Sequence, residues 1–325
     1  TSGGTESNNL ALRGISEGML QTRECKNAHI ITTGIEHSSV LETATVLGSQ
    51  EGTLTTLPVD AEGRLSPSDL EEALRPDTVV VSIGLANHEI GTLQPIRELS
   101  RITHAHGVPL HVDAVQAAGK LPLDVDQLGV DALSLSAHKI YGPKGVGALY
   151  INRKTMKHKI KPIFFGGGHE NGLRPGTLAV HNIVGFGEAC GIAKNEMKKN
   201  HILLNSLTNL MLEKLSEGFN GIIVNGNMKA RIPGNLNISF PELNQEPLIQ
   251  KLKDIAVSSG SACTTSTPTP SHVLMALGIR KNLLSSSIRI GIGRFNTSEE
   301  IELASDYILN IVNKLKVNKK GVLND

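Results

Sequence analysis

The sequence predicts an α/β fold, in which a mostly parallel sheet carries helices on both faces and a smaller α+β domain follows. Short apolar runs alternate with helix-like segments over the first two thirds of the chain, which is typical of a parallel sheet. The pattern changes near residue 195, where a long amphipathic segment over residues 196–218 precedes short β-like runs. A chain of 325 residues is long enough for two domains, which we place at residues 1–199 and 200–325.

In the first domain we expect six strands and two well-marked helices. The strands are expected at Ala28–Thr33, Thr53–Pro58, Thr78–Leu85, Val108–Val112, Val130–Leu135 and Gly147–Ile151. The helices are expected at Ser66–Leu74 and Pro95–His106. Ser66 can N-cap the first of these helices, Pro67 suits its first position and Asp69 favours its first turn.

In the second domain a long helix over residues 196–218 is followed by mixed elements. Strands are expected at Gly221–Val224 and Asn235–Ser239, and a further helix at Glu246–Leu252. The last helix is expected to begin at Thr297, because Glu300 three residues later completes a capping box.

The composition excludes several classes of protein. Lys and Arg number 32 against 31 Asp and Glu, so neither a nucleic-acid partner nor a polybasic membrane contact is expected. No apolar run is long enough to cross a membrane, and the polar residues 1–9 resemble neither a signal nor a transit peptide. The cysteines, Cys25, Cys190 and Cys263, are far apart, which argues against a disulfide scaffold or a zinc site and favours a reducing compartment.

Reactive side chains follow two of the expected strands. Asp113 ends one apolar run, and Ser136, His138 and Lys139 follow another. Because ligands bind at the carboxyl ends of parallel strands, these side chains can converge on one site. A reactive lysine, a carboxylate and glycines and hydroxyls that cradle a phosphate are what a pyridoxal phosphate (PLP) site needs.

Each of these residues also has a purely structural interpretation. Lys139 alone would be a surface lysine, but the flanking Ser136 and His138 favour an amine that forms an imine with PLP. Asp113 could keep a pyridine nitrogen protonated or simply N-cap a helix. Gln116, three residues later, could donate to the ring oxygen.

Four further parts of the chain are candidates for the same site. In residues 2–7 the glycines and Thr5 could bind an anion at a helix N-terminus, or form an ordinary capping turn. His37 could stack on a flat cofactor and shuttle protons, or be an ordinary hydrogen-bonded histidine. Cys263 lies among small, polar and proline residues, which suits a nucleophilic thiol on a loop, whereas Cys25 and Cys190 fit buried, inert positions better. Arg289 could bind a substrate carboxylate or form a structural salt bridge.

Taken together, these residues resemble the class-V aminotransferase family and, within it, the cysteine desulfurases. The resemblance runs nearly the whole length of the chain. It is carried by residues 1–9 (TSGGTESNN), 36–37 (EH), 87–91 (NHEIG), 111–116 (HVDAVQ), 136–139 (SAHK), 140–147 (IYGPKGVG), 166–177 (GGGHENGLRPGT), 258–263 (SSGSAC) and 287–290 (SIRI).

The resemblance implies a PLP-dependent transferase with the aspartate aminotransferase-like fold, which converts L-cysteine to L-alanine. Lys139 would hold PLP, and His37 would stack on its ring and assist proton transfers. The implied cofactor contacts come from Gly4, Thr5, His37, His88, Asp113, Gln116, Ser136, His138, Lys139 and, from the partner in a homodimer, Thr177. Arg289 and Asn87 would bind the substrate.

The resemblance also implies that Cys263 takes the sulfur as a persulfide for an iron–sulfur scaffold or a sulfur-carrier protein. No resident metal is expected, and Cys263 would ligate an iron–sulfur centre only transiently. A reducing compartment, either the cytoplasm or the mitochondrial matrix, is expected.

Three departures from the family's pattern leave alternatives open. The family normally has a few tens of residues before the phosphate loop, at which this chain opens. His88 stands where a second asparagine is common, and Pro175 and Gly4 stand where serine and alanine are common. The alternatives are a selenocysteine lyase, in whose family these variants also occur, and a non-catalytic fragment or partner subunit.

Overall fold

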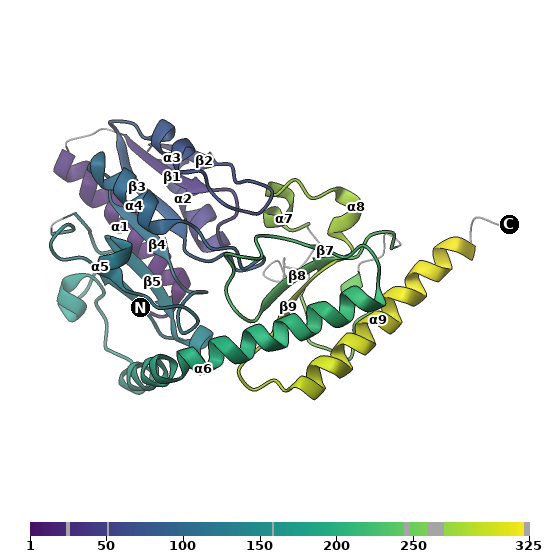
Figure 1. The fold of residues 1–325 in the computed structure, drawn as a ribbon. Helices are drawn as coiled ribbons and strands as arrows, with labels where there is room; N and C mark the ends of the chain where they lie inside the picture. The colour runs from purple at the N-terminus through teal and green to yellow at the C-terminus, as the bar shows by residue number, and fades with distance from the viewer. Residues whose placement is uncertain (24–26, 51, 158, 244–247, 259–269, 322–325) are drawn as a thin grey trace. The chain divides into compact units, whose positions relative to one another are not determined.

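The computed structural model describes the chain except residues 24–26, 51, 158, 244–247, 259–269 and 322–325 (Figure 1). It divides into two compact units. The first consists of Thr1–Asp60, Arg64–Asn87 and Gln94–Met197, and the second of Ala61–Gly63, His88–Leu93 and Lys198–Asp325. Two short segments from the first hundred residues therefore belong to the second unit.

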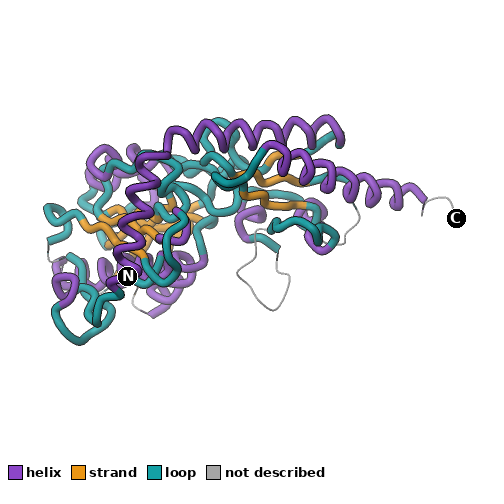
Figure 2. The backbone as a smooth tube through the Cα atoms, turned by 90° about the horizontal axis from the view of Figure 1, so that it is seen from below, coloured by secondary structure: helices purple, strands orange, loops and turns teal. Residues whose placement is uncertain are grey.

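The first unit is built on a six-stranded sheet in the order β2-β1-β3-β4-β5-β6. Figure 2 draws the strands in orange among the purple helices. The strands are β1 (Ala28–Thr33), β2 (Gly52–Leu57), β3 (Thr78–Gly84), β4 (Leu110–Asp113), β5 (Ala132–Ser136) and β6 (Gly147–Ile151). The first five run parallel, and β6 pairs antiparallel with β5. This arrangement confirms the predicted α/β fold with a mostly parallel sheet.

Helices cover this sheet. They are α1 (Gly4–Arg23), α2 (Ser38–Gln50), α3 (Pro67–Ala73), α4 (Ile96–Ala105) and α5 (Val125–Leu128), with the 3-10 turns η1 (Ala137–Ile140) and η2 (His169–Gly172). Helix α1 packs on β3, β5 and β6, and α2 packs on β1 and β2. All six residues of β1 are buried, as expected for a strand whose two faces are both covered.

The second unit contains a three-stranded antiparallel sheet in the order β7-β8-β9. Its strands are β7 (Ile223–Val224), β8 (Asn235–Ser239) and β9 (Ser287–Gly291), and its shorter helical elements are η3 (Leu248–Gln250), α7 (His272–Ala276) and α8 (Lys281–Leu284). Helix α9 (Ser298–Gly321) and the second half of α6 (Val180–Gly218) bury one apolar cluster with the sheet. Within it the rings of Phe219 and Phe240 meet edge to face at 5.3 Å.

The predicted capping box of the last helix is confirmed. The Thr297 N–H donates to Glu300 Oε2 at 3.1 Å, and the Glu300 N–H donates to Thr297 Oγ1 at 3.3 Å. At Ser66 the prediction was wrong in one respect, because its hydroxyl bonds to Ser68 Oγ rather than capping the backbone of α3.

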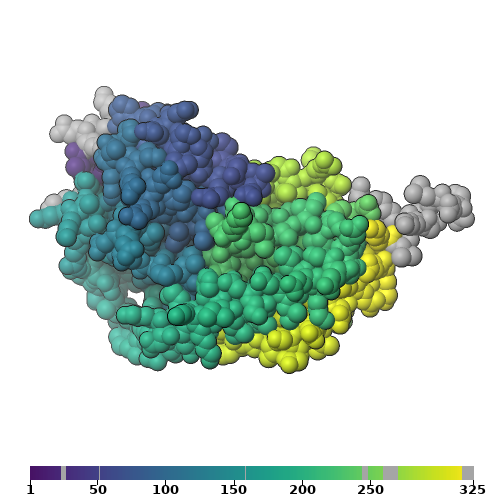
Figure 3. Space-filling view, in the orientation of Figure 1, coloured from purple at the N-terminus to yellow at the C-terminus, as the bar shows by residue number. Residues whose placement is uncertain are grey.

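Two helix predictions in the later part of the chain were also wrong. Helix α6 begins at Val180, sixteen residues before the predicted start, because glycines at 185, 187 and 191 weaken the helix signal in the sequence. Its first part lies at the surface (Figure 3), where Val180 and Val184 are exposed. The helix expected at Glu246–Leu252 is, in its described residues, only the turn Leu248–Gln250. Among the described helices, none has both the length and the apolar character needed to cross a membrane.

Candidate active site

Three chain segments of the first unit meet at the carboxyl ends of β4 and β5. Asp113 ends β4, Ser136 ends β5, and Gly4 begins α1. A Cβ added at Gly4 would lie 2.9 Å from Val115 Cγ2 and 3.6 Å from Ser136 Cβ, so only glycine fits without displacing its neighbours. The predicted convergence of Asp113 and Ser136 thus follows from parallel strand geometry, and the start of α1 joins them.

The N-terminus of α1 and the residues after β5 form a cradle suited to an anion. The Ser136 hydroxyl lies 2.9 Å from His138 Nδ1, and both His138 and Lys139 are exposed in the short turn η1. Burial lowers the pKa of His138, and the positive charges of Lys139 and Lys144 lower it further. Thr5 is exposed in the first turn of α1, where backbone N–H groups favour a negative charge.

Asp113 is a carboxylate held largely away from water. Its Oδ1 accepts from the Val115 N–H at 2.9 Å, and its Oδ2 accepts from Asn8 Nδ2 at 2.8 Å. Burial raises the pKa of Asp113, while these hydrogen bonds and the positive charges of His37 and Lys139 oppose the increase. A protonated ring nitrogen is the kind of partner that such a carboxylate stabilises.

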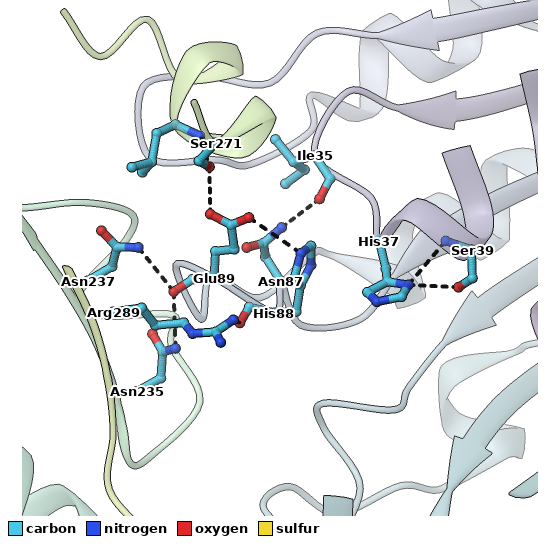
Figure 4. Close-up of polar contacts among 11 residues, drawn as sticks. Ile35, His37, Ser39, Asn87, His88, Glu89, Asn235, Asn237, Ser271 and Arg289 are labelled. Carbon is cyan, nitrogen blue, oxygen red and sulfur yellow. Dashed lines mark hydrogen bonds and ion pairs between the residues drawn. The ribbon is translucent and has the colours of Figure 1, made fainter. Parts of the chain in front are cut away.

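Asn8 and Ser39 connect Asp113 to His37. Asn8 Nδ2 also donates to Ser39 Oγ at 2.9 Å, and Ser39 Oγ lies 2.8 Å from His37 Nδ1 (Figure 4). The Ser39 N–H donates to the same ring nitrogen at 3.1 Å, so Nδ1 is an acceptor and a neutral His37 carries its proton on Nε2. Neither Asn8 nor Ser39 was predicted from the sequence as an individual candidate. Their positions, four residues after Gly4 on α1 and two residues after His37, were the available signals.

Glu36 is a second buried carboxyl group near Asp113. Its Oε1 accepts from Thr33 Oγ1 at 2.6 Å, and its Oε2 accepts from the Gly84 N–H at 2.8 Å. Burial raises the pKa of Glu36 to about 8, with a smaller contribution from the charge of Asp113. In the sequence Glu36 stood out only as part of the motif at residues 36–37, with no role predicted for it.

The remaining predicted contacts of the first unit are more dispersed. Asn87 is buried, and its Nδ2 donates to the Ile35 carbonyl at 2.7 Å. Gln116 is half-buried in the turn after β4. Thr177 is exposed and lines a cavity of about 840 Å³ together with Ser2, Arg174 and other residues of the first unit.

Arg289 and His88 belong to the second unit. Arg289 is half-buried on β9, and its Nη1 donates to the His88 carbonyl at 3.0 Å. The His88 ring lies with Nε2 3.6 Å from Glu89 Oε1, and its centroid is 6.2 Å from that of His272 (Figure 4).

The structure tests the prediction for only one of the three cysteines. Cys263 and Cys25 lie outside the described residues. The assignment of Cys190 to a buried position was wrong, because its part of α6 is exposed and only its neighbour Ala189 is buried.

Comparison with known proteins identifies the family. The sequence model of the aminotransferase class-V family matches residues 1–303. The chain belongs to this family. It is 47% identical to the cysteine desulfurase IscS of Pseudomonas entomophila, over 97% of this chain and 77% of that protein. It is 46% identical to the mitochondrial cysteine desulfurase of Arabidopsis thaliana, over 97% of this chain and 68% of that protein.

Solved structures agree with the sequence relatives. A NifS-like protein with 35% identity superposes with a TM-score of 0.86, over 97% of this chain and 82% of that chain. The structure of SspA in complex with cysteine, also 35% identical, gives a TM-score of 0.77 over 91% of this chain and 81% of that chain.

Members of the class-V family, including the cysteine desulfurases, depend on PLP. The residues of the first unit fit this group. Asn8 Oδ1 is buried beside Asp113 without a hydrogen-bond partner among the described residues, as expected where a donor from a ligand is still to be supplied. The glycines at the start of α1 and the Ser136 hydroxyl provide the donors that a phosphate requires.

Proposed function

We propose that this chain is a PLP-dependent cysteine desulfurase, which removes the sulfur of L-cysteine and leaves L-alanine. The observation that carries the proposal is the connection of Asp113 through Asn8 and Ser39 to His37, with the positive charge of Lys139 acting on Asp113. The high identity to named cysteine desulfurases over almost the whole chain supports the same reaction.

Each part of the cofactor has a matching group. Lys139 supplies the amine for covalent attachment, and Asp113 would bind the ring nitrogen. We assign the phosphate to Gly4, Thr5, Ser136 and His138 with Thr177 of a second copy, and the ring oxygen to Gln116 and His88. When bound, PLP withdraws electrons from the substrate carbon next to the amine.

The residues of this chain then bind and orient the substrate. Arg289 has five N–H donors, one of which is used by the His88 carbonyl, and it can offer two more to the cysteine carboxylate. Asn87 would lie against the substrate. His37, with its proton on Nε2 in the neutral form, would move protons to and from the substrate.

Cys263 would accept the sulfur of the substrate. The carbon–sulfur bond of cysteine breaks and a sulfur–sulfur bond forms on Cys263, so that L-cysteine and one thiol become L-alanine and one persulfide. No outside oxidant or reductant is needed for this step, because the sulfur atom transferred is neutral overall. The persulfide would then pass to an iron–sulfur scaffold or a sulfur-carrier protein.

We also propose a homodimer in a reducing compartment, the cytoplasm or the mitochondrial matrix. Exposed apolar side chains at Phe164, Phe165, Val180 and Val184 in the first unit support a partner surface. The relatives include bacterial proteins and a mitochondrial enzyme, which supports either compartment.

The test is the visible absorption spectrum of the chain with added PLP, before and after L-cysteine, followed by measurement of alanine. A cofactor band that changes with cysteine, and alanine in proportion to persulfide, are expected. A chain that binds PLP but forms no alanine would overturn the proposal. The ratio of turnover with cysteine to turnover with selenocysteine separates the desulfurase from the selenocysteine lyase.

A further inference from the structure

The segment of the second unit that contains Cys263 is tied at both of its described flanks. On the upstream side, the Ser258 N–H donates to the Arg289 carbonyl at 3.1 Å, and the Arg289 N–H donates to the Ser258 carbonyl at 2.6 Å. On the downstream side, Ser271 Oγ donates to Glu89 Oε2 at 2.6 Å (Figure 4). Cys263 lies between Ser258 and Ser271 in the sequence.

The two flanks are connected to each other. The guanidinium of Arg289 donates to the carbonyl of His88, the residue before Glu89. A continuous path therefore runs from Ser258 through Arg289, His88 and Glu89 to Ser271. We call these five residues the Glu89 network. It joins the proposed ligand of the substrate carboxylate to both flanks of the proposed sulfur acceptor.

Glu89 is fixed at the centre of this network. Its side chain is 1% exposed, and its backbone carbonyl accepts from Asn235 Nδ2 at 3.2 Å and from Asn237 Nδ2 at 3.4 Å. A Cβ at Gly91, two residues later, would lie 2.5 Å from Asn235 Oδ1, so the segment is pressed against β8. The carboxylate is therefore presented from a rigid position.

Ser271 uses both capacities of its hydroxyl. It accepts from the Leu274 N–H at 3.1 Å and so N-caps α7, while its proton goes to Glu89. It is 4% exposed. Loss of this hydroxyl would leave a buried carboxylate short of a donor and an uncapped helix at the flank of the Cys263 segment.

A carboxylate suits this position because it faces several donors and positive charges. Burial raises the pKa of Glu89, whereas the Ser271 bond and the charges of His272 and Arg289 oppose the increase. The His88 ring is also close, with Nε2 at 3.6 Å from Oε1. This contact is made by the histidine that departs from the family's usual asparagine.

We propose that Glu89 is a positioning residue for sulfur transfer. Glu89 accepts from Ser271 and directly follows His88, whose carbonyl accepts from Arg289. It would thereby fix the position of the substrate's proposed ligand relative to the described flanks of the Cys263 segment. The inference rests on the proposed function, because it assumes that Arg289 binds the substrate and that Cys263 accepts the sulfur. Displacing a reacting group by as little as about 1 Å can slow a reaction by about a hundredfold.

The test compares Ser271→Ala with Thr297→Ala. Both variants lose the N-cap of a helix in the second unit, but only Ser271 touches the Glu89 network. We expect both variants to lower the melting temperature, Ser271→Ala by more, because it also leaves the buried Glu89 carboxylate short of a donor. In Ser271→Ala alone we expect kcat for alanine formation to fall about tenfold, with KM for cysteine changed by less than about twofold. Ser271→Thr, which keeps the hydroxyl, should restore kcat.

A second readout needs no turnover. In a background in which Cys25 and Cys190 are replaced by serine, the rate at which Cys263 reacts with an aromatic disulfide measures how firmly its segment is held. We expect this rate to rise about fivefold in Ser271→Ala, because the downstream flank loses its contact with Glu89. The rate should stay unchanged in Thr297→Ala.

The outcomes separate the two proposals. Equal kcat and equal thiol reactivity in Ser271→Ala and the wild type, or equal losses in Thr297→Ala, would overturn the role of Glu89. A wild type that binds PLP but makes no alanine would overturn the proposed function and the assignment to sulfur transfer. The thiol-reactivity ratio would still decide whether the network holds the segment.

Discussion

The contacts that lead to His37 in the first unit and those that hold Arg289 in the second unit are of different kinds. In the first unit, side chains bond to side chains, as where Asp113 is joined through Asn8 and Ser39 to His37. In the second unit, Arg289 is held by backbone groups, with its own peptide paired to Ser258 and its guanidinium on a carbonyl. Side-chain networks fail when one member is removed, whereas contacts to backbone survive many substitutions. We therefore expect a single side-chain substitution to displace His37 more readily than Arg289.

The largest expected effect is that of Lys139→Ala. This change removes the amine that would hold the cofactor, so covalent attachment and alanine formation should both be lost, by at least about a thousandfold in rate. The visible spectrum with added PLP and the yield of alanine measure the two losses. A spectrum like that of the wild type would contradict the whole cofactor assignment.

Cys263→Ser should distinguish binding of the cofactor from acceptance of the sulfur. The cofactor side is unchanged in this variant, so PLP should bind and its absorption should still change with cysteine. Persulfide formation and sulfide release in the presence of a thiol reductant should fall to background, since serine cannot accept the sulfur. Full activity in this variant would remove Cys263 from the mechanism.

Ser39→Ala should show how far the side-chain network matters. His37 would lose one of the two contacts to its Nδ1, and Asn8 would lose an acceptor, so we expect kcat to fall about tenfold with little change in KM. Thr45→Ala, an exposed position on the same helix, is the matched control. A loss in both variants of equal size would indicate damage to α2 rather than to the network.

The smallest expected effect is a pH dependence of stability in the first unit. Glu36, whose pKa rises from 4.5 to about 8, holds its proton more tightly when folded, so stability should increase by about 1.4 kcal/mol per unit as pH falls from 8 to about 6.5. His111 is buried between Ser82 and Ser134, and its pKa falls from 6.5 to about 3. His111 stays neutral in the folded chain but binds a proton in the unfolded chain below about pH 6.5. The free energy of unfolding should therefore decrease as pH falls below that value.

Between about pH 6.5 and 4.5 the gain at Glu36 and the loss at His111 cancel, whereas His29, whose pKa falls from 6.5 to about 4, adds a further loss of stability as pH falls. Urea unfolding of the chain from pH 4 to pH 8 measures this profile. Glu36→Gln should abolish the change in stability between about pH 6.5 and 8, whereas the exposed control Glu98→Gln should keep it. The same change in Glu36→Gln would show that the group titrates normally in the folded state.

Much of the first unit could be predicted from local patterns. The strands Ala28–Thr33 and Gly147–Ile151 have the predicted bounds, because each is a short run of mainly apolar and β-branched residues next to turn residues. The convergence of Asp113 with Ser136 follows from the same information, since parallel neighbours end at one edge of the sheet. The assignment of one domain boundary at residue 199 stays a prediction.

Local sequence patterns were sufficient to predict the reactive groups, their order along the chain and the sheet that carries them. The tertiary structure decided which groups bond to one another. Asn8 meets Ser39 across 31 residues, and Glu89 meets Ser271 across 182, so no local period records either contact. The grouping of His88–Leu93 with the second unit is of the same kind, because it depends on Asn235 and Asn237 reaching the Glu89 carbonyl. Periodicity reports burial within one element, whereas hydrogen bonds between distant segments exist only once the chain has folded.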